Sequence, residues 1–175
     1  MNNSTFVHKY LTPLIERDSV CVDMTAGGGN DTLFLAQHSD HVIAFDISKE
    51  AIERSKKRCA AYPDILFICD SHENIRSYLK EKADVILFNL GYDPYGERNT
   101  PTKSSSSLKA VKEAWDLLKE EGYLVITFYR GHPGGKDEYY VLKDYIEKNG
   151  LFVLETYQRH LKIDEPVTYI LKKIS

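Results

Sequence analysis

The chain has 175 residues, about the length of one domain, and with 42% hydrophobic and 28% charged residues its composition excludes a disordered protein. The 23 Lys and Arg against 26 Asp and Glu leave a formal net charge of −3, which excludes a protein that holds long nucleic acid by charge alone. We therefore expect a single domain over residues 1–175. An RNA partner would have to be bound through local contacts or with the help of another component.

Neither a membrane span nor a secretion signal is visible. The longest apolar run, Val85–Leu90, is much shorter than the roughly 18 residues of a span and contains Asn89. The polar first residues lack the basic and apolar regions of a signal peptide. The three cysteines, Cys21, Cys59 and Cys69, form no C-x-x-C pair, so we expect neither a disulfide framework nor a metal site. These features predict a cytoplasmic protein.

Apolar stretches of strand length alternate with helical periodicity along the chain, which predicts an α/β fold. The N-terminal segment 1–18 is expected to be helical. Several of the strands are continuously apolar, as is typical of parallel strands buried on both faces. The first five strands are expected at Val20–Met24, His41–Ile47, Ile65–Asp70, Ala83–Leu90 and Tyr123–Tyr129.

Helices are predicted between these strands. Ser48 can cap a helix that Pro63 stops. Apolar residues at three- to four-residue spacing predict a second helix from residue 108 to 118, with Gly122 as its stop signal. Including a later one that ends at Gly150, the helices are expected at about 48–62, 108–118 and 136–149.

The alternation of strands and helices ends after residue 150. Leu151–Tyr157 and Val167–Lys172 both read as strands, and the short segment between them has no room for a crossover helix. The two strands must therefore either pair antiparallel or separate within the sheet. Five β-α units followed by a hairpin is the order of a class I methyltransferase domain, whereas a dehydrogenase sheet would continue with crossover helices. The expected fold is a Rossmann-like, seven-stranded, mostly parallel sheet with a C-terminal antiparallel hairpin strand and helices on both faces.

The strongest local motif is the run Val20–Thr32, in which a buried strand leads into Gly27, Gly28 and Gly29 and then into a helix. Glycines let the backbone pass close to a ligand, and the helix N-terminus presents free N–H groups. A tight turn without a ligand would look similar. The motif also fails to separate binders of nucleotides, flavins and S-adenosylmethionine.

Polar residues also follow the second and third strands. Asp46 ends the second strand, where a carboxylate can accept hydrogen bonds from ribose hydroxyls of NAD or S-adenosylmethionine alike. The alternative is a solvated Asp at a helix start. Asp70, Ser71 and His72 follow the third strand, where a polar residue commonly meets an adenine amino group; a cap on the next helix is an equally good interpretation.

The fourth strand ends in Asn89-Leu90-Gly91-Tyr92. Amino-group methyltransferases carry an Asn or Asp followed by a turn and an aromatic residue at this place. The side-chain oxygen and a backbone carbonyl accept hydrogen bonds from the acceptor amine, while the aromatic ring packs against the base. Catalysis is then largely positioning, because a neutral amine needs no strong base. A simple turn is the alternative.

A glycine-flanked histidine, His132, follows the fifth strand in Tyr129–Lys136, at the same end of the sheet as the other motifs. It could take a proton, orient a substrate or contact phosphate, although a lone His is more often structural. Arg130 and Lys136 are candidate phosphate contacts, or plain surface charges.

Together these motifs resemble the small bacterial family first described as rRNA methylases. Its members are now assigned as methyltransferases of the tRNA wobble uridine, which convert 5-aminomethyl-2-thiouridine to its 5-methylaminomethyl form. His8 matches a histidine that the family usually carries near the N-terminus. The resemblance covers nearly the whole chain and rests on Val22–Ala36, Ala44–Ile47, Asn89–Tyr92 and Gly131–Gly135.

The resemblance implies S-adenosylmethionine as cofactor and the anticodon arm of tRNA as partner. The residues that would contact the acceptor are Asn89, Tyr92 and His132. The residues that would hold the cofactor are Thr25, Gly27, Gly29, Asn30, Asp31, Thr32, Asp46, Ile47, Asp70, Ser71, His72 and Asn89. A limited basic surface would grip the RNA, and a homodimer would complete it; its candidate residues are Arg98, Lys103, Arg130, Lys136 and Arg159.

The chain departs from the family pattern at Gly28, Asn30, Asp93, Tyr95 and Arg130. The last three lie where a substrate would enter, which leaves another amine acceptor open. Two other functions also stay open. One is a methyltransferase of the same fold that acts on rRNA or on a small-molecule amine. The other is a nucleotide- or RNA-binding module without catalysis, which would leave the motif after the fourth strand without a role.

Overall fold

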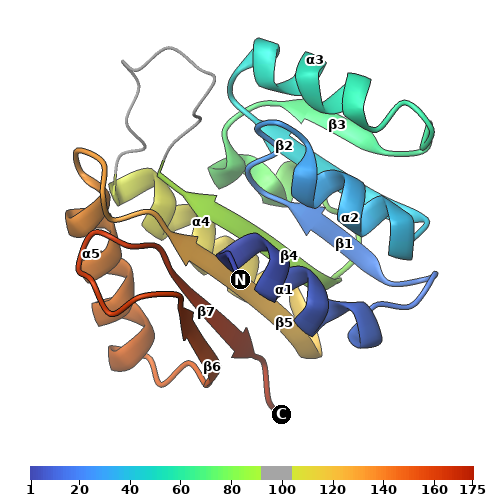
Figure 1. The fold of residues 1–175 in the computed structure, drawn as a ribbon. Helices are drawn as coiled ribbons and strands as arrows, with labels where there is room; N and C mark the ends of the chain where they lie inside the picture. Colours follow the sequence, from blue (N-terminus) through green and yellow to red (C-terminus); the bar gives the residue numbers. More distant parts are fainter. Residues whose placement is uncertain (92–103) are drawn as a thin grey trace.

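A computed structural model describes residues 1–91 and 104–175, and its centre is one seven-stranded sheet (Figure 1). The strands are ordered β3-β2-β1-β4-β5-β7-β6. Their bounds are β1 Val20–Asp23, β2 His41–Asp46, β3 Leu66–Cys69, β4 Ala83–Leu90, β5 Leu118–Phe128, β6 Val153–Gln158 and β7 Val167–Lys172.

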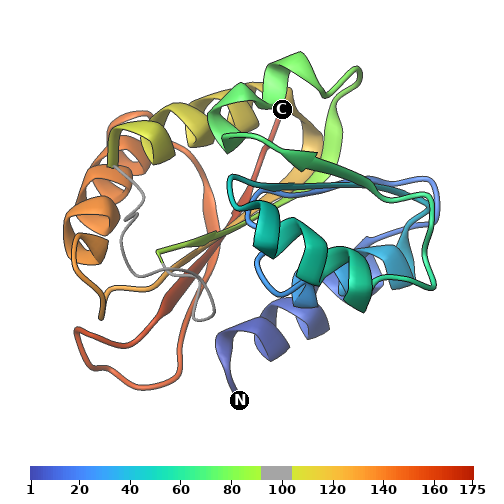
Figure 2. The same ribbon diagram turned by 90° about the horizontal axis from the view of Figure 1, so that it is seen from above.

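Helices cover both faces of this sheet. Figure 2 shows α1, α2 and α3 on one side of the strands and η2, α4 and α5 on the other. No helix within the described residues is long and apolar enough to cross a membrane. The helices are α1 Asn3–Leu11, η1 Thr12–Leu14, α2 Asn30–His38, α3 Lys49–Arg58, η2 His72–Ser77, α4 Ser104–Leu117 and α5 Gly135–Lys148.

The pairing of the strands confirms the predicted fold class. Strands β1 to β5 run parallel to one another, whereas β7 is antiparallel both to β5 on one side and to β6 on the other. The hairpin therefore folds back so that its second strand enters the sheet between β5 and β6. The carboxyl ends of the five parallel strands meet along one edge, where ligands of open α/β sheets bind.

The N-terminal helix α1 packs on the α2 face and reaches the end of the hairpin. Val7 and Leu11 are buried in the core beneath it. At its first residue, the buried Asn3 donates a hydrogen bond of 3.0 Å to the hydroxyl of Thr168 in β7. Contacts at both ends of α1 thus hold one of its faces against the carboxyl edge of the sheet.

Two predicted helix ends differ from the structure. The helix capped by Ser48 ends at Arg58, because residues 59–61 turn before Pro63 is reached. The next long helix ends at Leu117, and Gly122 lies inside β5, where it is not the predicted helix stop. A Cβ on Gly122 would come within 2.9 Å of the carbonyl oxygen of Lys119, so close backbone packing explains this glycine.

Candidate active site

The glycine turn joins β1 to the start of α2. Gly27 and Gly29 have φ values of +50° and +80°, which favour glycine, and a Cβ on Gly29 would lie 2.9 Å from the Cα of Ser55 in α3. A Cβ on Gly28 would meet nothing within 4 Å. The turn therefore packs tightly against α3 at Gly29 and stays open at Gly28, directly before the free N–H groups of the α2 N-terminus.

Asp46 joins this turn to the end of β2. One carboxylate oxygen accepts a hydrogen bond of 2.9 Å from the backbone N–H of Gly27, and the other accepts one of 2.9 Å from Ser48. Each oxygen keeps a further lone pair, so the carboxylate can accept additional hydrogen bonds. Ile47, the next residue, is exposed beside it.

The three polar residues after β3 have different surroundings. The Asp70 carboxylate accepts from Tyr78, Asn74 and the backbone of Ser71, and these hydrogen bonds, led by that from Tyr78, lower its pKa. The His72 ring is buried, with Nδ1 3.3 Å from the carbonyl oxygen of Met24, and burial lowers its pKa. Asp70 therefore organises the start of η2, and the His72 ring packs into the core.

A chain of polar side chains runs across the carboxyl edge from α1 to β4. Asp31, in the first turn of α2, accepts a 2.6 Å hydrogen bond from His8 Nε2 and one of 3.2 Å from the Ser4 hydroxyl on the same oxygen, Oδ1. Its other oxygen, Oδ2, accepts from the side-chain amide of Asn89. The backbone N–H of Asn89 donates to the hydroxyl of Thr25 at 2.8 Å. Asn89 is therefore bonded through both its side chain and its backbone.

Asp23, which sequence analysis did not select, lies fully buried beneath this chain. It accepts hydrogen bonds from the backbone of Thr25 at 3.0 Å and from the hydroxyl of Thr32 at 2.6 Å. Burial first, and then the nearby charge of Asp31, raises the pKa of Asp23 to about 7. A carboxylate that ends an otherwise apolar strand was the available signal for it.

One ring nitrogen of His132, on the other side of the edge, lacks a hydrogen-bond partner among the described residues. Its Nδ1 is 2.9 Å from the carbonyl oxygen of Pro133, and because a carbonyl only accepts, this nitrogen carries the proton. In the neutral ring Nε2 is then an acceptor. Nε2 is buried and has no partner among the described residues. A Cβ on Gly91 would come within 2.0 Å of it, so Nε2 lies directly over the turn after β4.

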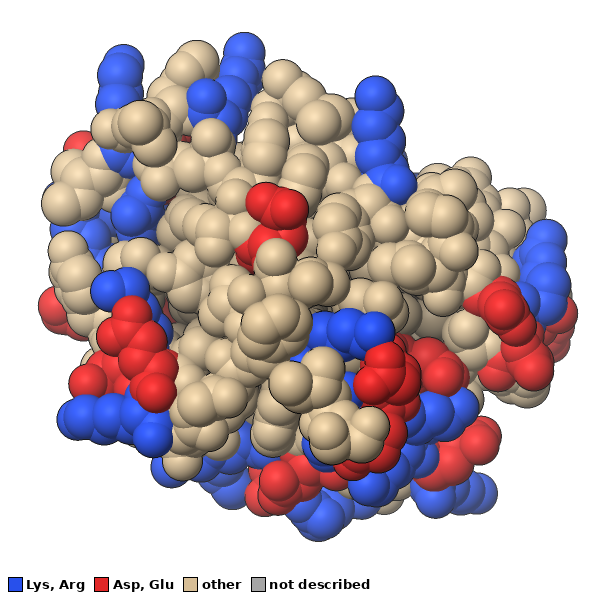
Figure 3. Space-filling model, turned by 90° about the horizontal axis from the view of Figure 1, so that it is seen from below, with Lys and Arg blue, Asp and Glu red and all other residues tan. Residues whose placement is uncertain are grey.

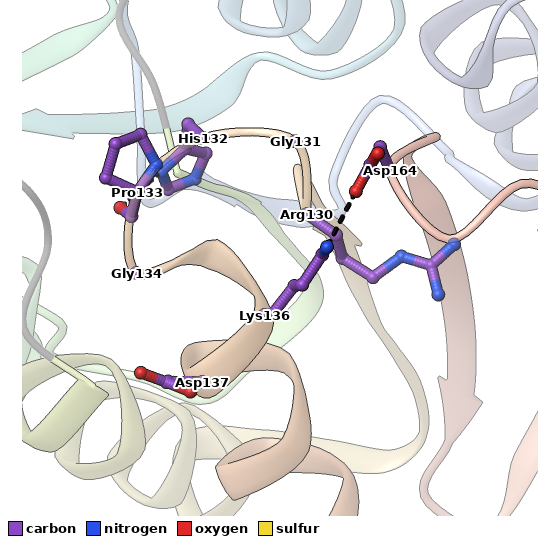
Figure 4. Close-up of a pocket in the computed structure, with 8 residues that line it drawn as sticks. All are labelled: Arg130, Gly131, His132, Pro133, Gly134, Lys136, Asp137 and Asp164. Atoms are coloured by element: carbon purple, nitrogen blue, oxygen red, sulfur yellow. Dashed lines mark hydrogen bonds and ion pairs between the residues drawn. The ribbon is translucent and has the colours of Figure 1, made fainter.

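A pocket of about 320 Å³ opens beside His132 (Figure 4). Lys136 forms a 2.9 Å ion pair with Asp164 across it. The Arg130 side chain is buried, extends away from His132, and donates hydrogen bonds to the carbonyl oxygens of Lys162 and Glu165. Arg130 thus holds the loop between β6 and β7, and the geometry does not support the prediction that it contacts phosphate.

The structure brings most of the predicted site residues to one edge of the sheet. Asn30 is exposed at the first position of α2, whereas the Thr32 side chain is buried on Asp23, so the helix start offers a ligand mainly its backbone there. Tyr92, Asp93, Tyr95, Arg98 and Lys103 lie outside the described residues. The assembled edge presents an open glycine turn, a carboxylate at the end of β2 and an oriented amide at the end of β4, and the buried Nε2 of His132 lies beside them over Gly91.

Comparison with known sequences identifies relatives. Residues 42–170 match the family model described as "Putative rRNA methylase". A chloroplastic tRNA (mnm(5)s(2)U34)-methyltransferase of Arabidopsis thaliana is 32% identical over 157 residues, which cover 78% of this chain and 56% of that protein. This chain therefore spans little more than half the length of that relative.

Two crystal structures share the fold over almost their whole length. A "putative rRNA-methylase" from Clostridium thermocellum has a TM-score of 0.90 and 26% identity, covering 99% of this chain and 98% of that one. A "putative methyltransferase" from Streptococcus mutans, solved in complex with SAH, has a TM-score of 0.88 and 26% identity, covering 99% of both chains. The strand order of this chain and its likeness to these two structures both establish the class I methyltransferase fold.

Proposed function

The chain belongs to the rRNA methylase family, and from this premise we propose that it is an S-adenosylmethionine-dependent N-methyltransferase. Its proposed acceptor is the 5-aminomethyl group of 2-thiouridine at the wobble position of tRNA. The name of the Arabidopsis thaliana relative supports this acceptor. The observation that carries the proposal is the Asn89 amide, which Thr25 and Asp31 hold at the carboxyl end of β4.

The residues at the edge fit the cofactor. The turn is open at Gly28, the α2 N-terminus presents N–H groups to a carboxylate, and Asp46 offers lone pairs to ribose hydroxyls. The segment Asp70–His72 lies at the neighbouring strand end, where it would meet the adenine through its backbone. When bound, S-adenosylmethionine supplies the methyl group from its sulfonium and leaves as SAH.

The acceptor amine must arrive neutral, with its lone pair pointing at the methyl group. The Asn89 side-chain oxygen accepts a hydrogen bond from the amine and so sets the direction of the lone pair. The methylated nitrogen then gives up one proton. His132 Nε2, an acceptor without a partner among the described residues, takes that proton or orients the amine. Tyr92 would shape the pocket, as predicted from the motif.

A small basic surface binds the proposed RNA partner. Among the residues that the structure describes, Lys136 and Arg159 are the candidates for this contact. Figure 3 shows one face of the molecule on which Lys and Arg stand beside Asp and Glu, without a large patch of one sign. For a chain with a formal net charge of −3, binding through a few local contacts fits better than binding through long-range charge. A homodimer would extend the surface, and light scattering with and without tRNA tests this part of the proposal.

Nucleoside mass spectrometry tests the proposed activity. The purified protein and S-adenosylmethionine are incubated with tRNA that carries 5-aminomethyl-2-thiouridine. The expected result is that this nucleoside gains the mass of one methylene. An Asn89→Ala variant should lose turnover much more than cofactor affinity, and equal loss of both would refute its acceptor role. Asp46→Ala should chiefly raise the dissociation constant of the cofactor.

The family description favours one other acceptor, rRNA. In that case the tRNA nucleoside would gain no mass while the cofactor still binds. Incubation of the protein and S-adenosylmethionine with ribosomal subunits from a wild-type strain and from a strain that lacks this protein then identifies the substrate.

A further inference from the structure

We propose that Asp31 is a positioning residue of the acceptor site: it sets the orientation of the Asn89 amide and is itself held by His8 from the N-terminal helix. This inference rests on the proposed N-methyltransferase function. It gives Asp31 a task different from the cofactor contact that sequence analysis predicted.

The chemistry of the pair determines which way the amide points. An ionised carboxylate only accepts hydrogen bonds, so the group that Asn89 turns toward Asp31 Oδ2 must be its NH₂. The amide oxygen consequently points away from Asp31. The acceptor amine needs that oxygen, because its N–H groups donate hydrogen bonds. A rotated amide would turn the NH₂ group of Asn89 toward the amine, and two donors would then face each other. Asp31 therefore selects the one amide orientation that can direct the lone pair of the amine.

Asp31 is itself tightly held. Its side chain is only 11% exposed, and Oδ1 accepts from both His8 Nε2 and the Ser4 hydroxyl of α1. The His8 ring stacks on Phe34 of α2 with ring centroids 4.1 Å apart, which holds the ring in place. The other titratable groups that face Asp31 within the described residues are Asp23 from β1 and Tyr129 after β5. With donors on both oxygens, the carboxylate has one orientation, and it transmits that orientation to Asn89.

An exchange of the two side chains tests the pair. The single variant Asn89→Asp places two carboxylates opposite each other, so turnover should survive only while they share one proton. Its kcat should fall on the order of 10- to 100-fold and fall further as pH rises. In the double variant Asp31→Asn/Asn89→Asp, the new amide accepts from His8 and donates to the new carboxylate, which restores the hydrogen-bond pattern. The double variant should regain most of the lost kcat and lack the extra pH dependence.

Two more variants separate positioning from other roles. Asp31→Ala should lower kcat while the dissociation constant of S-adenosylmethionine stays near that of the wild type, as measured by calorimetry. His8→Ala should lower kcat less, because the Ser4 hydroxyl still bonds Oδ1. Thermal unfolding of each variant controls for folding, and the exchange provides a second route if Asp31→Ala is unstable.

The outcomes are distinct. A double variant no more active than Asn89→Asp would overturn the inference, as would an Asp31→Ala variant that loses cofactor affinity and keeps kcat. The latter result would assign Asp31 to the cofactor. If the wild-type protein transfers no methyl group to any RNA or amine, the proposed function itself fails. Fully active wild type with insensitive Asp31 variants refutes only the positioning role.

Discussion

Individual residues at the carboxyl edge are arranged by a few buried polar groups. Asp23 has no exposure and bonds both Thr25 and Thr32, so one carboxyl holds the end of β1 and the start of α2 together. Its raised pKa means that this support titrates close to neutral pH. The stability of the site should therefore depend on pH in a way that an exposed carboxylate would not cause.

Asp23→Asn tests this dependence. An unfolded Asp titrates near 3.8 and the folded Asp23 near 7, so between these values the folded state binds more protons than the unfolded state. The contribution of Asp23 to stability is thus favourable at low pH relative to high pH and is lost as pH rises from about 4 to 7. The Asn side chain cannot ionise. The Thr32 hydroxyl, which donates to Asp23 in the wild type, can instead accept a hydrogen bond from the NH₂ group of the Asn.

Urea unfolding from pH 5 to pH 8 measures the effect. The free energy of unfolding of the variant minus that of the wild type should increase with pH and level off above about 7. The exposed Asp40→Asn is the matched control. A difference that stays constant over this range would contradict the buried-carboxyl interpretation.

A second test at this scale compares two neighbouring glycines. Gly29→Ala forces a Cβ against Ser55 at a φ of +80°, so it should destabilise the protein and weaken cofactor binding. Gly28→Ala meets nothing within 4 Å and should leave stability unchanged. Thermal unfolding and calorimetry with SAH measure both properties, and a Gly29→Ala variant with wild-type stability and affinity would show that the turn tolerates a Cβ at Gly29.

At the scale of elements, helix α1 matters because it delivers His8 to Asp31. The helix is anchored by Leu11, which is completely buried, whereas Leu14 just beyond it is 37% exposed. A loss of packing under α1 would therefore affect the edge of the sheet through His8 as well as the core.

Leu11→Ala should cost about 3 kcal/mol of stability, as large-to-small substitutions of buried leucines do, and should also lower kcat. Leu14→Ala should change stability by about 0.5 kcal/mol or less. Denaturant unfolding and steady-state turnover check this pair. Full turnover in a destabilised Leu11→Ala protein would indicate that α1 contributes to the core alone.

At the scale of the whole molecule, the net charge of −3 means that the proposed RNA binding would depend on a few basic residues. Lys136→Gln and Arg159→Gln should each reduce the slope of log affinity for tRNA against log salt by about 1. Arg17→Gln is the matched control, since Arg17 is exposed and precedes β1, away from the carboxyl edge of the sheet. Unchanged slopes for Lys136 and Arg159 would place the RNA on another surface.

The sequence by itself determined the order of the strands along the chain, the two strands that close it without a crossover helix, and the place of the glycine turn, Asp46, Asn89 and His132 at strand ends. These depend on local patterns of apolar residues and on turn chemistry. It also indicated the family through contiguous motifs. Only the tertiary structure decided what the side chains do. The bonds from His8 to Asp31 and from Asp31 to Asn89 join residues 23 and 58 positions apart, and Arg130 bonds a loop more than 30 residues away. Hydrogen bonds at such separations follow from how the strands and helices pack, which no local pattern specifies.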